Sequence, residues 1–153
     1  MTGYPILRPA RPDEYAFALD IYLDGMREHA ASLMQWNDAQ QAARFAGQWR
    51  AEETEIILNH GSPVGFVMLE EGDAEILLKQ FVIKGSARRA GLGSAVLDLL
   101  VGRADRAGKP MLLGVLRGNP ALRLYERKGF YVTGESDIKL LMRRAPGVSR
   151  GQL

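Results

Sequence analysis

A loop rich in glycine and arginine, between a predicted strand and a predicted helix, is the part of this sequence best suited to chemistry. An apolar strand ending at Ile83 gives way to a loop with Arg88 and Arg89, and Gly91 and Gly93 stand where a helical pattern begins. Glycine lets a ligand approach the backbone closely. The first N–H groups of a helix have no internal acceptor and favour an anion, and arginine adds planar donors that suit phosphate. The stretch therefore predicts a site for a small polyanion.

Two common phosphate-binding motifs do not fit this loop. A P-loop needs a lysine near its end, and that lysine is missing. A dinucleotide fingerprint needs a third glycine where Val96 stands, and an acid about twenty residues further on, where the chain has Leu112 and Leu113. The spacing Arg88-x-x-Gly91-x-Gly93 instead matches (Gln/Arg)-x-x-Gly-x-(Gly/Ala). It resembles the coenzyme A pyrophosphate loop of the GCN5-related N-acetyltransferase (GNAT) family.

A second stretch resembles another signature of the same family. Residues 119–130 read Asn-Pro-Ala-Leu-Arg-Leu-Tyr-Glu-Arg-Lys-Gly-Phe. They match roughly Asn-x-x-Ala-x-x-Leu-Tyr-Glu-Lys-x-Gly-Phe, with the alanine one position early at Ala121. One helix and one strand separate the two motifs, as the family requires. The order of elements agrees from Ile6 to Met142, whereas the specific motifs cover only residues 80–94 and 119–130.

The remaining patterns predict the elements that position these motifs. Strands are expected at residues 6–8, 55–58, 64–69, 75–83, 111–116, 130–133 and 138–142, and helices from Pro12, from Asn37 or Asp38, from Leu92 to about Arg106, and at 121–128. The resemblance implies an α/β (α+β) fold: a mixed, mostly antiparallel sheet of six to seven strands, flanked by about four helices and splayed between two central parallel strands. Residues 1–144 are expected to form a single domain, and residues 145–153 a flexible tail.

The resemblance further implies that acetyl-coenzyme A is the cosubstrate. It would lie between the strand ending at Ile83 and the strand starting at Met111, with its pyrophosphate on the glycine loop. Asn119 would lie near the pantetheine arm and Tyr125 near the sulfur. The implied binding residues are Phe81, Val82, Ile83, Arg88, Arg89, Ala90, Gly91, Leu92, Gly93, Ser94, Asn119 and Tyr125.

Transfer of an acetyl group to an amine asks for a base that removes the ammonium proton and a donor for the leaving thiolate. The resemblance implies Tyr125 as the general acid. Some relatives carry a glutamate where this chain has Leu77. Glu75 lies two residues earlier and shares the same face if the strand is regular, although a β-bulge, frequent in this strand of the family, would change its direction. Glu75 and an ordered water are therefore both candidate bases.

The acceptor amine is not indicated by the sequence. His29, Gln35 and Trp36 lie between the first two predicted helices, where they are candidate substrate-binding residues or simply part of a helix–helix connection. Protein N-termini, lysine side chains, polyamines, amino acids and antibiotics all remain open as acceptors.

Composition excludes several other classes of function. The chain has 153 residues, a formal net charge of +2, no cysteine and two histidines. The basic residues form no long run, so nucleic-acid binding is not expected, and neither is a metal site. No apolar stretch approaches a membrane-spanning length, so we expect a cytoplasmic protein with no membrane partner. Homodimers are common in the family, but the sequence does not itself predict the oligomeric state.

The leading hypothesis is an acetyl-coenzyme A-dependent N-acetyltransferase that acts on a primary amine of a small molecule, peptide or protein. A coenzyme A-binding regulatory or sensor domain without turnover is the alternative: Leu77 in place of the glutamate favours it, and Tyr125 disfavours it. A nucleotide-binding module that uses the same loop is a third reading.

Overall fold

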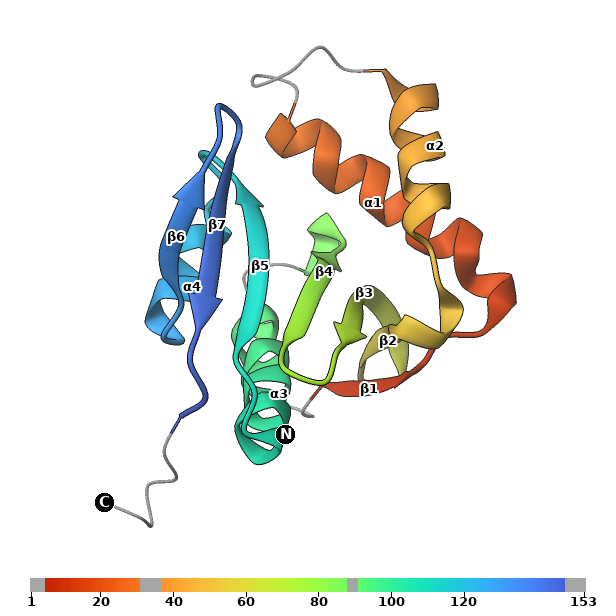
Figure 1. Ribbon diagram of the computed structural model, residues 1–153. Coiled ribbons are helices and arrows are strands. Elements are labelled where there is room, and N and C mark those ends of the chain that lie inside the picture. The colour runs from red at the N-terminus through yellow and green to blue at the C-terminus, as the bar shows by residue number, and fades with distance from the viewer. Residues whose placement is uncertain (1–4, 31–36, 88–90, 148–153) are drawn as a thin grey trace.

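The computed structural model describes residues 5–30, 37–87 and 91–147 (Figure 1). Its strands are β1 Ile6–Pro9, β2 Thr54–Asn59, β3 Ser62–Glu71, β4 Ile76–Ile83, β5 Met111–Leu116, β6 Tyr131–Glu135 and β7 Lys139–Arg144. Its α-helices are α1 Tyr15–Ala30, α2 Asp38–Gln48, α3 Leu92–Ala107 and α4 Ala121–Arg127, and short 3₁₀ turns occupy Pro12–Glu14, Ala51–Glu53 and Gly85–Ala87. No helix in these ranges is both long enough and apolar enough to cross a membrane.

The strands form one seven-stranded sheet in the order β1-β2-β3-β4-β5-β7-β6. Every neighbouring pair is antiparallel except β4 and β5, which are parallel. The β2–β3 hairpin turns at His60 and Gly61, whose φ angles are 53° and 81°; a two-residue turn with two left-handed residues matches the twist of the flanking strands. The expected mixed sheet with two parallel strands at its centre is confirmed.

The two parallel strands part soon after they begin. The β4–β5 ladder ends where Leu78 lies opposite Leu113, although β4 itself continues to Ile83. At the same point the β3–β4 register shifts between Met68 and Leu69, and Lys79 is left as an extra residue on β4. Such a β-bulge bends the strand that carries it. The expected splay, and the bulge that the family resemblance suggested, are therefore both present.

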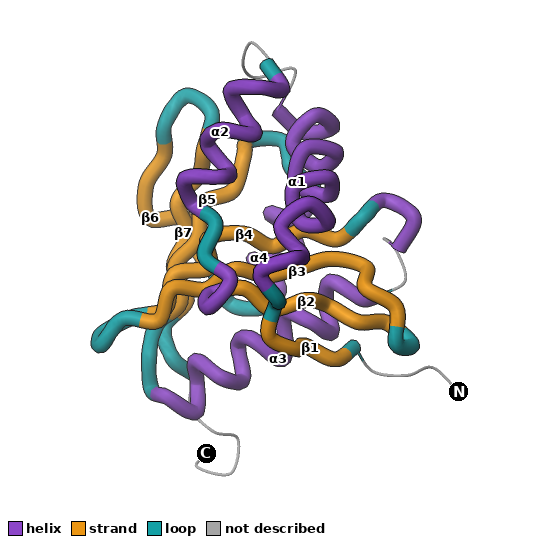
Figure 2. Tube along the Cα trace, turned by 90° about the vertical axis from the view of Figure 1, so that its right-hand side faces the viewer, coloured by secondary structure: helices purple, strands orange, loops and turns teal. Residues whose placement is uncertain are grey.

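The helices cover the two faces of the sheet separately (Figure 2). α1 and α2 build one core with the first strands, whose fully buried members are Ala18, Phe45, Ile56, Phe66 and Met68. α3 and α4 build a second core on the opposite face, whose buried members include Val96, Leu100, Met111, Leu113, Tyr125 and Met142. On α1 an apolar stripe at helical spacing belongs to the α1–α2 core, and its members are Tyr15, Ala18, Leu19, Tyr22 and Met26. Side chains that alternate along one strand thus serve two different cores.

Two bidentate ion pairs attach α3 to the sheet. Arg103 donates to both carboxylate oxygens of Glu55 on β2, at 2.5 and 2.6 Å. Asp105 accepts from both terminal nitrogens of Arg144 on β7, at 2.7 and 3.2 Å. Asp105 also accepts the backbone N–H of Gly147 at 2.7 Å, so residues within the predicted tail contact the domain. Paired, two-point geometry of this kind fixes the orientation of the helix.

β3 and β4 leave no room for a side chain at Gly65. A Cβ added at Gly65 would lie 2.3 Å from the carbonyl oxygen of Val82, and a paired backbone has little freedom to move aside. We expect Gly65→Ala to lower the free energy of unfolding by about 1–3 kcal/mol, the usual cost of overpacking. Urea denaturation with unchanged slope would measure this loss.

Gly47→Ala is the matched control. Gly47 lies in α2, and an added Cβ there would meet no atom within 4 Å, so alanine should raise the free energy of unfolding by about 0.5–1 kcal/mol. Wild-type stability in Gly65→Ala would show that β3 and β4 do not approach as closely as described.

Candidate functional site

The N-terminus of α3 is open to an anion. Gly91 precedes the helix with a left-handed φ of 76°, and a Cβ added there would meet no atom within 4 Å. The first helical hydrogen bond runs from the N–H of Ala95 to the carbonyl oxygen of Gly91, so the N–H groups of Leu92, Gly93 and Ser94 have no acceptor within the helix. The helix has neither a side-chain cap nor an acid in its first turn.

The other helices show what a capped start looks like. Asn37 caps α2 by accepting the N–H of Gln40 at 2.9 Å, as the sequence predicted. Asn119 accepts the N–H of Ala121 at 2.9 Å at the start of α4. The helix there begins at Ala121, where the sequence predicts it, and ends at Arg127. Unlike α2 and α4, α3 therefore begins at the glycine loop without a side-chain cap. Arg88, Arg89 and Ala90, predicted for the same loop, lie outside the described residues.

Three predicted elements converge on Gly93. A Cβ placed there would lie 3.6 Å from Leu124 of α4, 3.7 Å from Ile83 and 4.0 Å from Phe81, both on β4. These are ordinary van der Waals distances, so the first turn of α3 lies against the end of the bulged strand and against the second sequence motif. Both motifs, which are separated by one helix and one strand in the chain, border the gap left by the parting of β4 and β5.

Tyr125 is buried in the core that α3 and α4 form with the sheet. Its ring meets the ring of Phe130 edge to face, with centroids 5.6 Å apart, and among the described residues its hydroxyl makes no hydrogen bond. Burial raises the pKa of Tyr125 well above its ordinary value because the phenolate would lose its hydration. Tyr125 therefore stays protonated at neutral pH and keeps a hydroxyl proton available to donate.

Glu75 lies away from the other predicted residues. It precedes β4 instead of belonging to it, its side chain is exposed, and its carbonyl oxygen accepts the N–H of Gly72 at 2.9 Å in a turn. Phe81 lies six positions beyond Glu75, a distance of roughly 20 Å along an extended strand. Glu75 thus stands at the closed end of the β4–β5 pair, whereas the gap opens at the other end. The structure does not bring Glu75 and Tyr125 together.

A pocket of about 400 Å³ opens on the α2 side of the sheet, where β4 and β5 diverge. The residues lining it are Gln48, Leu77, Leu78, Lys79, Leu112, Leu113, Gly114, Thr133, Lys139, Leu141 and Met142. Of the residues predicted to bind substrate, Gln35 and Trp36 lie outside the described residues, and of His29 only the backbone, at the end of α1, is described.

A polar network that sequence reasoning missed supports the bulge beside this pocket. The ammonium group of Lys79 lies 2.7 Å from a carboxylate oxygen of Glu53 and 3.4 Å from the carbonyl oxygen of Gln48. Gln80 donates to the side-chain oxygen of Gln48 at 3.0 Å. Two consecutive residues therefore point to the same side, which a regular strand does not allow. The signal was the adjacent polar pair Lys79–Gln80 inside an otherwise apolar strand.

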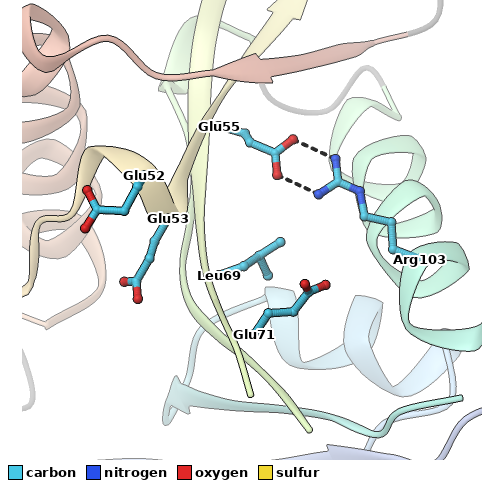
Figure 3. A pocket seen from close by; sticks show the side chains of 6 residues that line it. All are labelled: Glu52, Glu53, Glu55, Leu69, Glu71 and Arg103. Atoms are coloured by element: carbon cyan, nitrogen blue, oxygen red, sulfur yellow. Dashed lines mark hydrogen bonds and ion pairs between the residues drawn. The ribbon is translucent and has the colours of Figure 1, made fainter. Parts of the chain in front are cut away.

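A smaller pocket, of about 160 Å³, lies far from the glycine loop (Figure 3). Figure 3 shows Glu55 and Arg103 reaching toward each other, with Glu71 and Leu69 beside them. Arg103 is twelve residues beyond Gly91, about 18 Å along the helix axis. Hydrogen bonding to Glu55 raises the pKa of Arg103, so this pair is a permanent link between α3 and β2. The described residues contain no cluster of three or more potential metal ligands here or elsewhere.

Comparison with known proteins adds independent findings. A family model described as an acetyltransferase (GNAT) domain matches residues 46–132, which include the glycine loop and the whole of the second motif. No curated protein matches the sequence. Solved structures match over nearly the whole chain.

Three of these structures illustrate the likeness. The PaiA N-acetyltransferase of Thermoplasma acidophilum, solved in complex with coenzyme A, is 12% identical with a TM-score of 0.74, over 94% of this chain and 99% of that one. Ard1 of Thermoplasma volcanium is 20% identical with a TM-score of 0.69, over 95% and 100%. A Corynebacterium glutamicum protein, described as histone acetyltransferase HPA2 and related acetyltransferase, is 20% identical with a TM-score of 0.70, over 97% and 99%. At these identities the likeness shows a shared fold.

Proposed function

The chain belongs to the acetyltransferase (GNAT) family, and on that premise we propose that it is an N-acetyltransferase that moves an acetyl group from acetyl-coenzyme A to a primary amine. The observation that carries this proposal is the uncapped start of α3, placed beside the gap between β4 and β5. A screen of amines with acetyl-coenzyme A, read by release of free thiol, tests it.

The residues present fit the cosubstrate. The N–H groups of Leu92, Gly93 and Ser94 would hold the pyrophosphate, because they lack helical acceptors and no side chain at Gly91 covers them. The first turn carries no acid that would repel an anion. Phe81 and Ile83 border the same space on β4. A related structure, the PaiA N-acetyltransferase, is a complex with coenzyme A, which supports the assignment.

Acetyl-coenzyme A would supply an activated acetyl thioester: the amine nitrogen bonds to the carbonyl carbon, the carbon–sulfur bond breaks, and the thiolate leaves. We propose that Tyr125 stabilises that leaving thiolate. A thiol, with a reference pKa near 8.5, is a stronger acid than a tyrosine near 10, and burial widens this difference. Tyr125 would therefore donate a hydrogen bond to the thiolate and keep its own proton.

For the base, the geometry favours water over Glu75. Glu75 is exposed and lies at the closed end of the paired strands. The described lining of the pocket contains no carboxylate, and Leu77 stands where some relatives carry a glutamate. The chain would then depend on the fraction of amine that is already neutral, with water accepting the proton.

The missing carboxylate also favours a second candidate function. A coenzyme A-binding sensor without turnover needs the loop and the gap between the strands but no base. Such a protein would bind acetyl-coenzyme A and release no thiol with any amine, which the same screen would show.

We expect Gly91→Glu to weaken coenzyme A binding by more than about 100-fold, because a carboxylate beside bound pyrophosphate is a like-charge contact that costs several kcal/mol. Gly91→Gln is the matched control, since it brings the same backbone strain and nearly the same volume without the charge. Calorimetric titration with coenzyme A measures both variants. Equal affinity of the two variants for coenzyme A would show that the loop does not form the anion site.

Tyr125→Phe keeps the ring and its packing on Phe130 and deletes only the hydroxyl. We expect kcat to fall by roughly 10–10³-fold, the range for loss of one positioned donor. Affinity for acetyl-coenzyme A should hold, because charge on sulfur develops mainly in the transition state. A stable variant with full activity would mean that Tyr125 serves only the core.

Glu75→Gln decides between the two candidate bases. Because Glu75 is exposed and remote from Tyr125, we expect kcat and its pH profile to stay near the wild-type values. A fall of about 10²–10⁴-fold that shrinks at high pH, the usual cost of a lost base, would instead assign the base to Glu75.

A further inference from the structure

Among the described residues, no helix covers β5, β7 and β6 on the side of the sheet that α1 and α2 occupy elsewhere (Figure 1). Leu77 on β4 and Leu141 on β7 are 38% and 51% exposed there, and both line the pocket of about 400 Å³ beside the splayed strands. Pockets of this volume suit small molecules. The pocket therefore has an apolar floor next to the place where the proposed transfer would occur.

The charged groups of this pocket are all cationic. Its lining contains Lys79 and Lys139 and no carboxylate. Lys79 is neutralised by Glu53 at 2.7 Å, and both side chains are mostly buried. Lys139 has no ion pair or side-chain hydrogen bond among the described residues. Arg143 alternates with Leu141 on β7 and so points to the same side of the sheet. An unpaired positive charge thus lies at the rim of an apolar surface.

The lack of a side chain at Gly114 leaves room for the side chain of Lys139 to lie over β5. A Cβ added at Gly114 would lie 3.7 Å from Cδ of Lys139 and 3.9 Å from its Nζ. The lysine stem therefore lies across the strand at the one lining position that has no side chain, and its ammonium group stands above the floor of the pocket. An occupant that packs on Leu141 and Leu77 would meet this ammonium.

We propose that the acceptor is a small amine of the amino-acid type, with an apolar side chain on the Leu77–Leu141 floor and its carboxylate bound by Lys139. This inference rests on the proposed acetyl transfer for the fate of the amine, but the binding step stands on the pocket alone. Polyamines are disfavoured, because a polycation needs carboxylates and the described lining offers none. The same positive surroundings favour the neutral, reactive form of a bound amine.

A panel of apolar amino acids, each with its carboxamide, tests the inference. Calorimetry measures binding in the presence of coenzyme A, and thiol release measures turnover. In the wild type we expect at least one amino acid to bind more tightly than its amide. Lys139→Met keeps the stem and deletes the charge, so it should weaken that binding by roughly 10–100-fold, as for one lost hydrogen bond between charged groups, and leave the amide unchanged.

Lys109→Met is the matched control. Lys109 donates to the carbonyl oxygen of Gly72 outside the pocket, so its loss removes the same charge without touching the site. Affinity for coenzyme A should be the same in the wild type, Lys139→Met and Lys109→Met. If amino acids bind through Lys139 but no thiol is released, the proposed transfer fails and the binding site stands.

Three results would overturn the inference. These are the absence of binding by every amino acid in the panel, tighter binding of the amides or of spermidine, and equal loss in Lys139→Met and Lys109→Met. Sedimentation of the wild type and Leu141→Glu provides a fourth: a dimer that becomes a monomer in the variant would show that a second copy of the chain covers this face.

Discussion

The parting of β4 from β5 is the constraint on which the rest of this structure depends. A parallel ladder that continued to Ile83 would close the space between the strands with hydrogen bonds and leave no room for a ligand. Lys79 prevents this, because the extra residue bends β4 away from its neighbour. The bulge is held in turn by Glu53 and Gln48, so the end of α2 and the turn after it maintain a gap to which they contribute no strand.

The direction of α3 is fixed from both ends. At its start, the turn at Gly93 lies beside Leu124 and Ile83. Near its other end, Arg103 and Asp105 each make a two-point ion pair with the sheet. The N–H groups of the first turn are therefore fixed in direction by contacts within the protein, and the binding proposed above would require little reorganisation.

Sequence reasoning succeeded where the determining interactions are local. The glycine spacing, the Asn37 cap and the apolar periodicity of the first helix each depend on neighbours within one or two turns, and the seven strands were located to within a few residues. It failed where the outcome depends on pairing across the sheet. The extra residue at Lys79 is a matter of register, which no alternation of side chains reveals. The distance of Glu75 from the gap follows from where the β4–β5 ladder ends. That Lys139 has no ion pair among the described residues depends on which elements pack beside β7.

The strand order also determines when the gap between β4 and β5 can be completed during synthesis. β5 is held by β4 over only three residue pairs, and its other edge pairs with β7, which is made after β6. Until residues 139–144 have left the ribosome, the apolar run Met111–Leu116 keeps an open edge of the kind that recruits foreign strands. The wall of the gap that β4 forms is thus made early, while the opposite wall, formed by β5, waits for the final hairpin.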